Sequence, residues 1–208
     1  MEKLLDVDTG GGEFLLSLKH PFENTSAMEG YEPNIDLCKN NLLPLGIDFR
    51  PGNICEQFPF EDSMFDIVIN RHGDINISEF YRVLKPGGIF ITQQVGAEND
   101  RELVEALLGK IPLPFPEQYL NIVSKKLRNN GFEILEESEH FGKITFYDVG
   151  ALVWFAKNIE WEFNDFSVDS CLEQLMKLQD IIEKNGFAEG RTHRFMIVAE
   201  KKFQMNKN

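Results

Sequence analysis

The sequence has little positive charge, few cysteines and no long apolar run. Its 21 lysines and arginines are outnumbered by 34 aspartates and glutamates, which leaves a net charge of −13 at pH 7. A protein that binds a phosphate backbone normally presents a basic face, so this balance argues against a nucleic acid partner. No apolar run approaches the roughly 20 residues of a membrane-spanning helix. We therefore expect no membrane partner.

The N-terminal segment and the few cysteines and histidines argue against a secreted protein and against a metal-binding protein. The acidic N-terminus lacks the apolar core of a signal peptide, which favours a cytoplasmic location. The three cysteines show no Cys-x-x-Cys spacing and the four histidines are scattered, so we expect reduced thiols and no metal site. A chain of 208 residues is long enough for one α/β domain with a sizeable core.

The most informative segment is residues 4–16, which read LLDVDTGGGEFLL. An apolar run ends in a carboxylate, passes a glycine cluster and continues as an amphipathic pattern. This is the strand, tight turn and helix start of a nucleotide-binding unit. Glu29 ends the next predicted strand, 23 residues after Asp6. That interval is close to the roughly 20 residues expected for a carboxylate that holds a ribose.

The glycine pattern does not fit a dinucleotide. The fingerprint G-x-G-x-x-G, counted from Gly10, needs its third glycine at Leu15. This mismatch disfavours an NAD(P)-dependent oxidoreductase. An ordinary strand-to-helix turn without a ligand is the remaining alternative for the glycine cluster taken alone.

Asp6, Gly10 and Gly12 instead resemble the first motif of class I S-adenosylmethionine (SAM)-dependent methyltransferases, acidic-x-Gly-x-Gly-x-Gly. Asp8 stands where that family has its first glycine, and aspartate tolerates positive φ better than most residues. Residues 52–70 resemble the family's adenine-facing segment and fourth strand. The run RVLKPGG at 82–88 resembles its helix, turn and fifth strand. The ordered matches cover about residues 3–95.

This resemblance implies an α/β fold: a Rossmann-like, doubly wound, mostly parallel seven-stranded sheet with an antiparallel last strand, in a single domain over 1–208. Strand–helix alternation supports the same architecture. We predict strands at 3–7, 25–30, 46–49, 65–70, 88–95, 132–138, 143–147 and 194–200. Helices are expected at 12–19, 33–43, 75–84, 100–109, 117–130 and 170–184.

A long excursion over 148–190 precedes the last predicted strand and is rich in aromatic residues, including Trp154, Trp161, Phe163 and Phe166. Connections of this length commonly carry function, and we expect a substrate lid. Packing of an extra helix on the sheet edge is the alternative. The first strand begins three residues after Met1, where members of the family carry helices that cover the cofactor. Either the sequence starts late, or this cover comes from 148–190 or a partner subunit.

The family resemblance also implies the cofactor site. Asp6 and Gly10 to Gly12 face the methionine part of SAM, Glu29 accepts the ribose hydroxyls, and Asn53 and Ile54 contact the adenine. Asp8 and Asn70 complete the predicted cofactor set. The alternatives are a solvated strand-end charge for Glu29 and a plain turn for Asn53.

Arg71 and His72 follow the fourth predicted strand, where the family places groups that face the transferred methyl. His72 is a candidate general base and Arg71 a candidate partner for a substrate carboxylate. Gln93 and Gln94 are weaker candidates. A structural histidine is the alternative, because methyl transfer needs little beyond orientation and exclusion of water.

These observations predict SAM-dependent methyl transfer to a small-molecule acceptor. A catalytically inactive binding protein with the same fold is the main alternative, because Asp8 departs from the motif and the N-terminal cover is missing. An NAD(P)-dependent oxidoreductase is the third.

Overall fold

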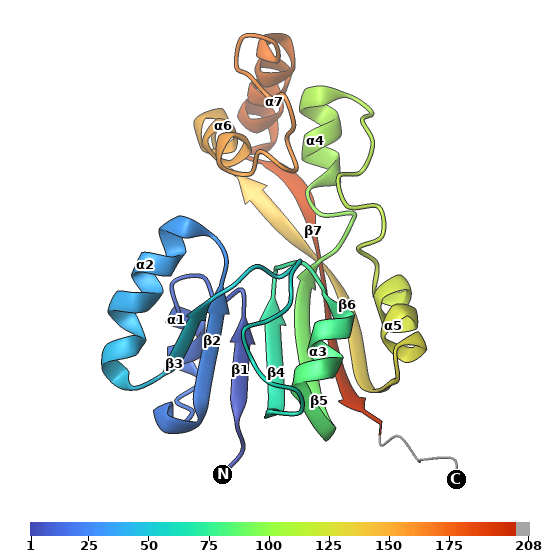
Figure 1. The fold of residues 1–208 in the computed structure, drawn as a ribbon. Coiled ribbons are helices and arrows are strands. Elements are labelled where there is room, and N and C mark those ends of the chain that lie inside the picture. The colour runs from blue at the N-terminus through green and yellow to red at the C-terminus, as the bar shows by residue number, and fades with distance from the viewer. Residues whose placement is uncertain (203–208) are drawn as a thin grey trace. The chain divides into compact units, whose positions relative to one another are not determined.

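The computed structural model describes residues 1–202 (Figure 1). The strands are β1 (Leu4–Val7), β2 (Thr25–Glu29), β3 (Asp48–Pro51), β4 (Phe65–Arg71), β5 (Leu84–Val95), β6 (Phe132–Phe146) and β7 (Ala188–Lys201). The helices are α1 (Glu13–Ser17), α2 (Glu32–Asn41), α3 (Ile77–Val83), α4 (Arg101–Leu108), α5 (Leu120–Asn129), α6 (Val149–Asn158) and α7 (Leu172–Asn185). Short 3-10 turns lie at η1 (Phe22–Asn24) and η2 (Leu43–Leu45).

The seven strands form one sheet in the order β3-β2-β1-β4-β5-β7-β6, with β7 antiparallel (Figure 1). β1 pairs in parallel with both β2 and β4. The chain therefore winds outward in one direction through β2 and β3 and in the other through β4 and β5. Ligands of such sheets bind outside the carboxyl ends of the strands at this reversal. The predicted fold class is confirmed.

The chain divides into two compact units. Among the described residues, unit 1 holds Met1–Gln94, Leu120–Ser138 and 196–202, and unit 2 holds Val95–Tyr119 and Glu139–Phe195. Unit 2 thus includes 95–119 as well as the predicted excursion 148–190. The single domain over 1–208 and the lid at 148–190 stay predictions, and residues 203–208 lie outside the described residues.

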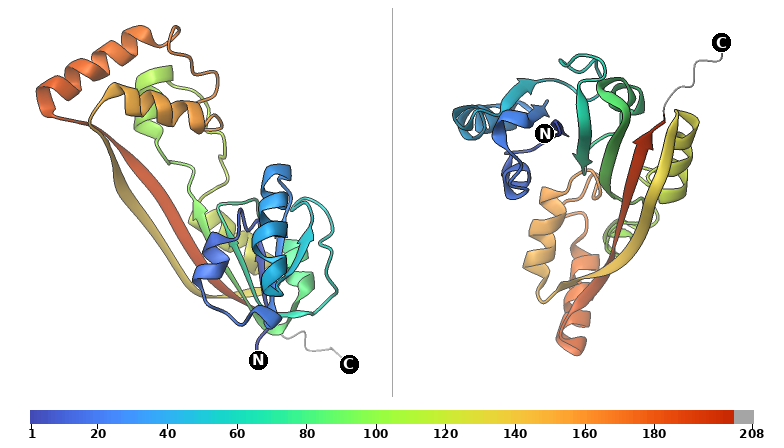
Figure 2. Two further views of the ribbon diagram at one scale, coloured as in Figure 1. Left: turned by 90° about the vertical axis from the view of Figure 1, so that its left-hand side faces the viewer. Right: turned by 90° about the horizontal axis from the view of Figure 1, so that it is seen from below.

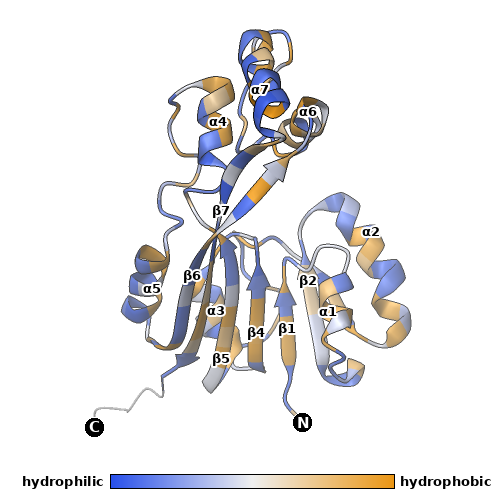
Figure 3. Ribbon diagram, turned by 180° about the vertical axis from the view of Figure 1, so that it is seen from behind, coloured by the Kyte–Doolittle hydropathy of each residue, from blue (hydrophilic) through white to orange (hydrophobic). Residues whose placement is uncertain are grey.

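The core of unit 1 has two faces because strand side chains alternate. Leu15 of α1 and Cys38 of α2 pack with Leu4 and Ala27 on one face. On the other face the Phe80 ring of α3 stacks on Phe90 of β5, 4.5 Å between centroids. α1 and α3 accordingly lie on opposite sides of the sheet (Figure 2). β1 and β4 are hydrophobic along most of their length, as expected for strands covered on both faces (Figure 3).

Unit 2 has a core of its own. Buried residues of α4, α6 and α7 form one cluster with Phe163, represented by Leu103, Leu152 and Leu175. Phe163 of the predicted excursion is 1% exposed, whereas Trp154 and Trp161 are 67% and 59% exposed. Of these three aromatic residues, one therefore supports the core and two face solvent.

The structure differs from the sequence prediction at three strands. Residues 132–147 contain one long strand, β6, instead of two. β6 is an edge strand whose side chains are largely exposed, so its charged residues do not interrupt it. β7 begins at Ala188, before the predicted Arg194. β5 begins at Leu84 and includes the predicted turn, where Gly87 has φ 79° and the pairing with β4 shifts register.

The length and polarity of the helices determine whether any of them could span a membrane. Within residues 1–202, each helix is either too short or too polar to cross a bilayer.

Candidate functional site

A pocket of about 390 Å³ lies within unit 1 at the carboxyl ends of β1, β2 and β4. Its volume falls within the range of about 300–1,000 Å³ that is typical of small-ligand sites. The pocket is lined by Asp8, Gly10, Glu29, Gly30, Tyr31, Asn34, Asn53, Ile54, Arg71, His72 and Gly73. The structure therefore brings together seven of the residues that the sequence selected, from segments up to 64 positions apart.

The glycine loop after β1 is held against α2. Gly10 has φ 64° and a side chain there would meet no atom within 4 Å, so its backbone borders open space. Gly12 has φ 88°, and a Cβ would lie 2.7 Å from the Leu42 side chain. The Cys38 thiol donates to the Gly10 carbonyl at 2.9 Å, and the Asn41 amide donates to Gly11 at 3.2 Å. Burial raises the pKa of Cys38 to about 12, so this donor keeps its proton.

Glu29 ties the end of β2 to the same loop. Its Oε2 accepts the Gly10 N–H at 2.7 Å, and its Oε1 accepts the N–H groups of Gly30 and Tyr31 at 2.9 and 2.8 Å. The residue is 5% exposed. An ionised carboxylate offers about four acceptor positions, and backbone donors occupy three of them here. Glu29 is therefore a structural partner of the loop as well as a lining residue of the pocket.

Asp8 adopts the left-handed conformation that its motif position requires, with φ 57°. Its carboxylate approaches Gly73 so closely that a Cβ there would lie 2.4 Å from Asp8 Oδ2. Burial, followed by repulsion from Glu29 and Asp74, raises the pKa of Asp8 to about 6. The backbone of Asp8 thus has the positive φ that was expected for this position, and its effect on a ligand stays a prediction.

Four predicted cofactor residues do not line the pocket, namely Asp6, Gly11, Gly12 and Asn70. Asp6 is 3% exposed and accepts the Thr9 hydroxyl at 2.6 Å, and burial raises its pKa to about 7. Gly12 is the N-cap of α1. Asn70 is fully buried because β4 lies between β1 and β5, where it pairs with Val7 and Thr92.

The Asn70 amide belongs to a buried polar network. Asn70 Oδ1 accepts from Gln94 Nε2 at 2.7 Å, and its Nδ2 donates to the Val7 carbonyl at 3.3 Å. Asn70 and Gln94 thus hold the ends of β1, β4 and β5 together. A role that requires either side chain to enter the pocket does not fit this arrangement.

Arg71 and His72 lie on the pocket wall. The Arg71 guanidinium stacks over the Phe14 ring at 3.8 Å, and its Nε donates to Gln93 Oε1 at 3.2 Å. His72 is exposed with φ 56°, and its backbone N–H donates to the Gln93 carbonyl at 2.9 Å. Gln93 therefore positions both residues.

The opposite wall comes from the loop before β4. Asn53 is exposed and its Oδ1 accepts the Cys55 N–H at 2.9 Å, while the Ile54 carbonyl accepts from the Asn76 amide at 2.8 Å. This bond to the N-cap of α3 fixes the loop.

Sequence reasoning missed four lining residues. Gly30, Tyr31 and Asn34 follow Glu29 directly into α2, and Gly73 follows His72. Their positions after a strand end were the available signal. A Cβ on Gly30 would lie 2.9 Å from the Gly52 carbonyl, which is a close approach that only the folded chain reveals.

Part of the chain is similar in sequence to known methyltransferases. Residues 5–92 match the family model described as "Methyltransferase domain". A phthiotriol/phenolphthiotriol dimycocerosates methyltransferase from Mycobacterium tuberculosis is 33% identical over 111 residues, which covers 50% of this chain and 40% of the relative. A fatty-acid O-methyltransferase from Mycolicibacterium smegmatis is 28% identical over 116 residues, covering 52% and 42%. The chain thus matches less than half the length of these curated relatives.

A solved structure extends the likeness to the whole fold. A Bacillus halodurans protein provisionally described as a methyltransferase superposes with a TM-score of 0.62 at 23% identity. The superposition covers 97% of this chain and 93% of that one.

Proposed function

We propose that this chain, whose residues 5–92 match the methyltransferase family model, is a class I SAM-dependent methyltransferase and transfers the methyl group of SAM to a small organic acceptor. The family's cosubstrate is SAM. The observation that carries the proposal is the pocket at the carboxyl ends of β1, β2 and β4, where Asp8, Gly10 and Glu29 meet Asn53 and Ile54. Bound SAM would supply a methyl group activated by its positive sulfonium.

The lining residues fit the parts of this cosubstrate. Gly10 borders open space, which lets a ligand approach the loop backbone. Glu29 offers a remaining acceptor position for a ribose hydroxyl, and the Asn53 amide with the Ile54 side chain suits a purine. Asp6 and Gly12 do not line the pocket but stabilise the loop, Asp6 through its hydrogen bond with Thr9 and Gly12 as the N-cap of α1.

The electrostatics of the pocket also suit a cationic cosubstrate. Two carboxylates, Asp8 and Glu29, line it, and Asp6 lies buried beside them. Arg71 is the one lysine or arginine among the lining residues, and it is stacked on Phe14. A positive sulfonium lowers the repulsion among these acids, whereas a pyrophosphate would increase it.

For the acceptor we propose a small molecule with an apolar body. One relative is a fatty-acid O-methyltransferase, which supports this class of acceptor. We propose that Arg71 binds a polar group of the acceptor and that His72 accepts a proton from it. Both residues line the pocket wall. The excursion 148–190 is proposed as the lid.

Calorimetric titration with SAM and with NADH tests the proposal, followed by transfer of isotope-labelled methyl from SAM to a panel of small metabolites. We expect SAM binding, no NADH binding, and label in an apolar acceptor. Binding of NADH alone would identify an oxidoreductase instead.

Two observations favour the alternative of a catalytically inactive protein. Glu29 already accepts three backbone N–H groups, and Asp8 replaces a motif glycine. A ribose would have to displace the Gly10 N–H to occupy two acceptor positions. Absence of SAM binding in the same titration would establish this alternative.

A further inference from the structure

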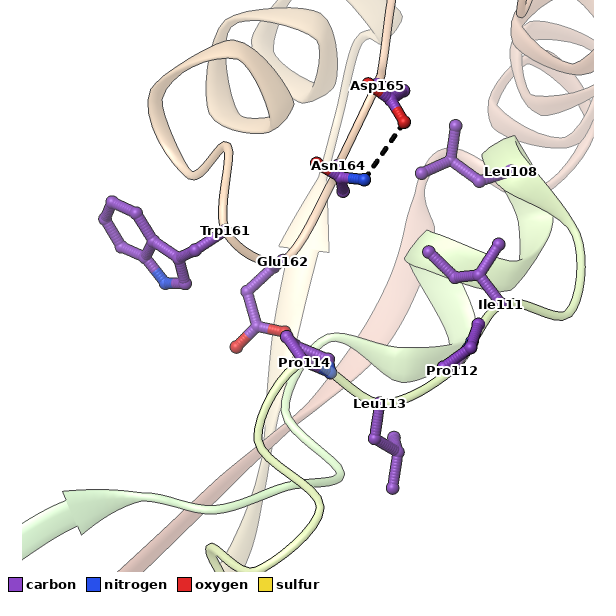
Figure 4. Close-up of a pocket in the computed structure, with 9 residues that line it drawn as sticks. All are labelled: Leu108, Ile111, Pro112, Leu113, Pro114, Trp161, Glu162, Asn164 and Asp165. Atoms are coloured by element: carbon purple, nitrogen blue, oxygen red, sulfur yellow. Dashed lines mark hydrogen bonds between the residues drawn. The ribbon is translucent and has the colours of Figure 1, made fainter.

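Unit 2 contains a second cavity, of about 590 Å³, which the proposed function does not use. Leu108, Ile111 and Leu113 form one side and Trp161 borders the other (Figure 4). These walls are mainly apolar, and the volume is sufficient for a small organic molecule. The cavity lies entirely within unit 2.

A buried acid forms part of this cavity. Glu162 is 5% exposed, and its carboxyl group extends toward Pro114 in the cavity wall (Figure 4). Asp165 is the other charged residue of the lining, which contains neither lysine nor arginine. An ionised carboxylate is strongly disfavoured in such a place unless a positive charge or hydrogen-bond donors compensate it.

The surrounding groups compensate Glu162 only in part. The Asn99 side chain hydrogen-bonds Glu162, and Asp100 adds a second buried acid whose Oδ1 has no hydrogen-bond partner among residues 1–202. Arg194 and Arg101 lie within electrostatic range. Arg194 donates to Asn99 and to the His193 carbonyl. Arg101 pairs with Glu105 at 3.0 Å and donates to the Ile111 carbonyl. These hydrogen bonds direct both arginines to groups other than Glu162.

We propose that this cavity binds a small molecule with an apolar body and a cationic amine, and that Glu162 is the counter-ion of the amine. The apolar walls take the body of the ligand, and its ammonium group supplies the positive charge that the lining lacks. A carboxylate ligand would face Glu162 and Asp165 and be repelled. This site requires no methyl transfer, so its test is independent of the proposed function.

The ionisation of Glu162 gives the site a distinct pH dependence. Burial, and then repulsion from Asp100, raises the pKa of Glu162 to about 7, while Asn99, Arg194 and Arg101 act in the opposite direction. Asp165 is the other titratable group on the cavity. An alkylamine keeps its proton up to about pH 10. Amine binding should therefore strengthen as the pH rises from 5.5 to 8 and Glu162 ionises.

Hexylamine, hexanol and hexanoate are the probes for a binding test on the full chain. The variant Trp154→Phe leaves Trp161 as the single tryptophan, so its fluorescence reports occupation of the cavity. We expect hexylamine to bind at pH 8 at least about tenfold more tightly than hexanol or hexanoate, and less tightly at pH 5.5. The proposal would be overturned if hexanol or hexanoate bound as tightly as hexylamine, or if hexylamine did not bind at all.

Glu162→Gln keeps the shape of the side chain and its ability to hydrogen-bond while removing the charge. We expect it to weaken hexylamine binding at least about tenfold and to abolish the pH dependence. Glu160→Gln is the matched control, because Glu160 is exposed and does not line the cavity. Equal effects of the two variants would contradict the assignment. If Glu162→Gln does not fold, the pH dependence of hexylamine binding to the chain that keeps Glu162 tests the same assignment.

Discussion

Glu29 Oε2 accepts the backbone N–H of Gly10 at 2.7 Å, across 19 positions of sequence. The bond joins the end of β2 to the glycine loop that follows β1. A carboxylate that looks from the sequence like a ligand-binding group is therefore also the anchor of the loop on which the ligand would lie. A change at Glu29 would therefore alter both the position of the glycine loop and the affinity for a ligand bound there.

Glu29→Ala is expected to weaken SAM binding at least about tenfold without unfolding the protein. Hydrogen bonds to charged groups contribute roughly 1.5–3 kcal/mol each, which corresponds to a tenfold effect or more. Because three backbone donors lose their acceptor, we also expect a lower melting temperature. Calorimetry on the folded variant measures the affinity, and Glu32→Gln at an exposed acid of α2 is the control. Unchanged affinity would remove Glu29 from the ligand site.

Asp8→Gly is expected to improve SAM affinity, because the relief of a crowded turn should outweigh the loss of one of the two carboxylates that line the pocket. The change removes a Cβ and a carboxylate from a turn where φ is 57°, a conformation that glycine adopts without strain. The extra backbone freedom of glycine opposes this by roughly 0.5–1 kcal/mol of stability. Asp8→Ala separates the two effects, since it removes the charge and keeps the Cβ. Weaker SAM binding by Asp8→Gly in calorimetry would mean that Asp8 itself contacts the cofactor.

Asp6→Asn is expected to change how stability depends on pH. Burial raises the pKa of Asp6 to about 7 from an unfolded value near 4, so the native state binds more protons than the unfolded state between these values. Stability from this group therefore falls as the pH rises from about 4 to 7. Asparagine carries no proton to lose and keeps an acceptor for Thr9.

Urea denaturation at pH 5 and pH 8 measures the effect. The difference in unfolding free energy, Asp6→Asn minus the parent, should be larger at pH 8 than at pH 5. Asp169→Asn, at an exposed position, serves as the control. The same difference at both pH values would show that Asp6 does not titrate in this range.

Replacement of 148–190 by a short turn is expected to abolish methyl transfer more than it weakens SAM binding. The helices α6 and α7 share a core with α4, so the replacement also exposes Leu103 and Leu107 of unit 2. The residues that line the proposed SAM pocket all belong to unit 1 and should keep their arrangement. Calorimetry and the labelled-methyl assay on the same sample compare the two activities. Transfer that survives the replacement would exclude a lid role for this segment.

Local sequence patterns were sufficient for the sheet class and for most of the pocket. Apolar runs that end in Asp6, Glu29 or Asn70 mark strand ends, and the carboxyl ends of parallel strands meet at one edge. Asp8, Gly10, Glu29, Arg71 and His72 could for that reason be grouped from the sequence. The turn at Gly87 was also visible, although the structure includes it within β5.

Contacts between distant residues decided the rest, because no local pattern encodes them. Burial of Asn70 follows from its position between β1 and β5, and the engagement of Glu29 with Gly10 follows from the packing of β2 beside β1. The same holds in unit 2, where Glu162 is an ordinary acid in the sequence and a buried one in the fold. The order of residues determines which side chains follow the end of a strand. Burial and hydrogen-bond pairing exist only in the folded chain, and they determine what each side chain can bind and how readily it ionises.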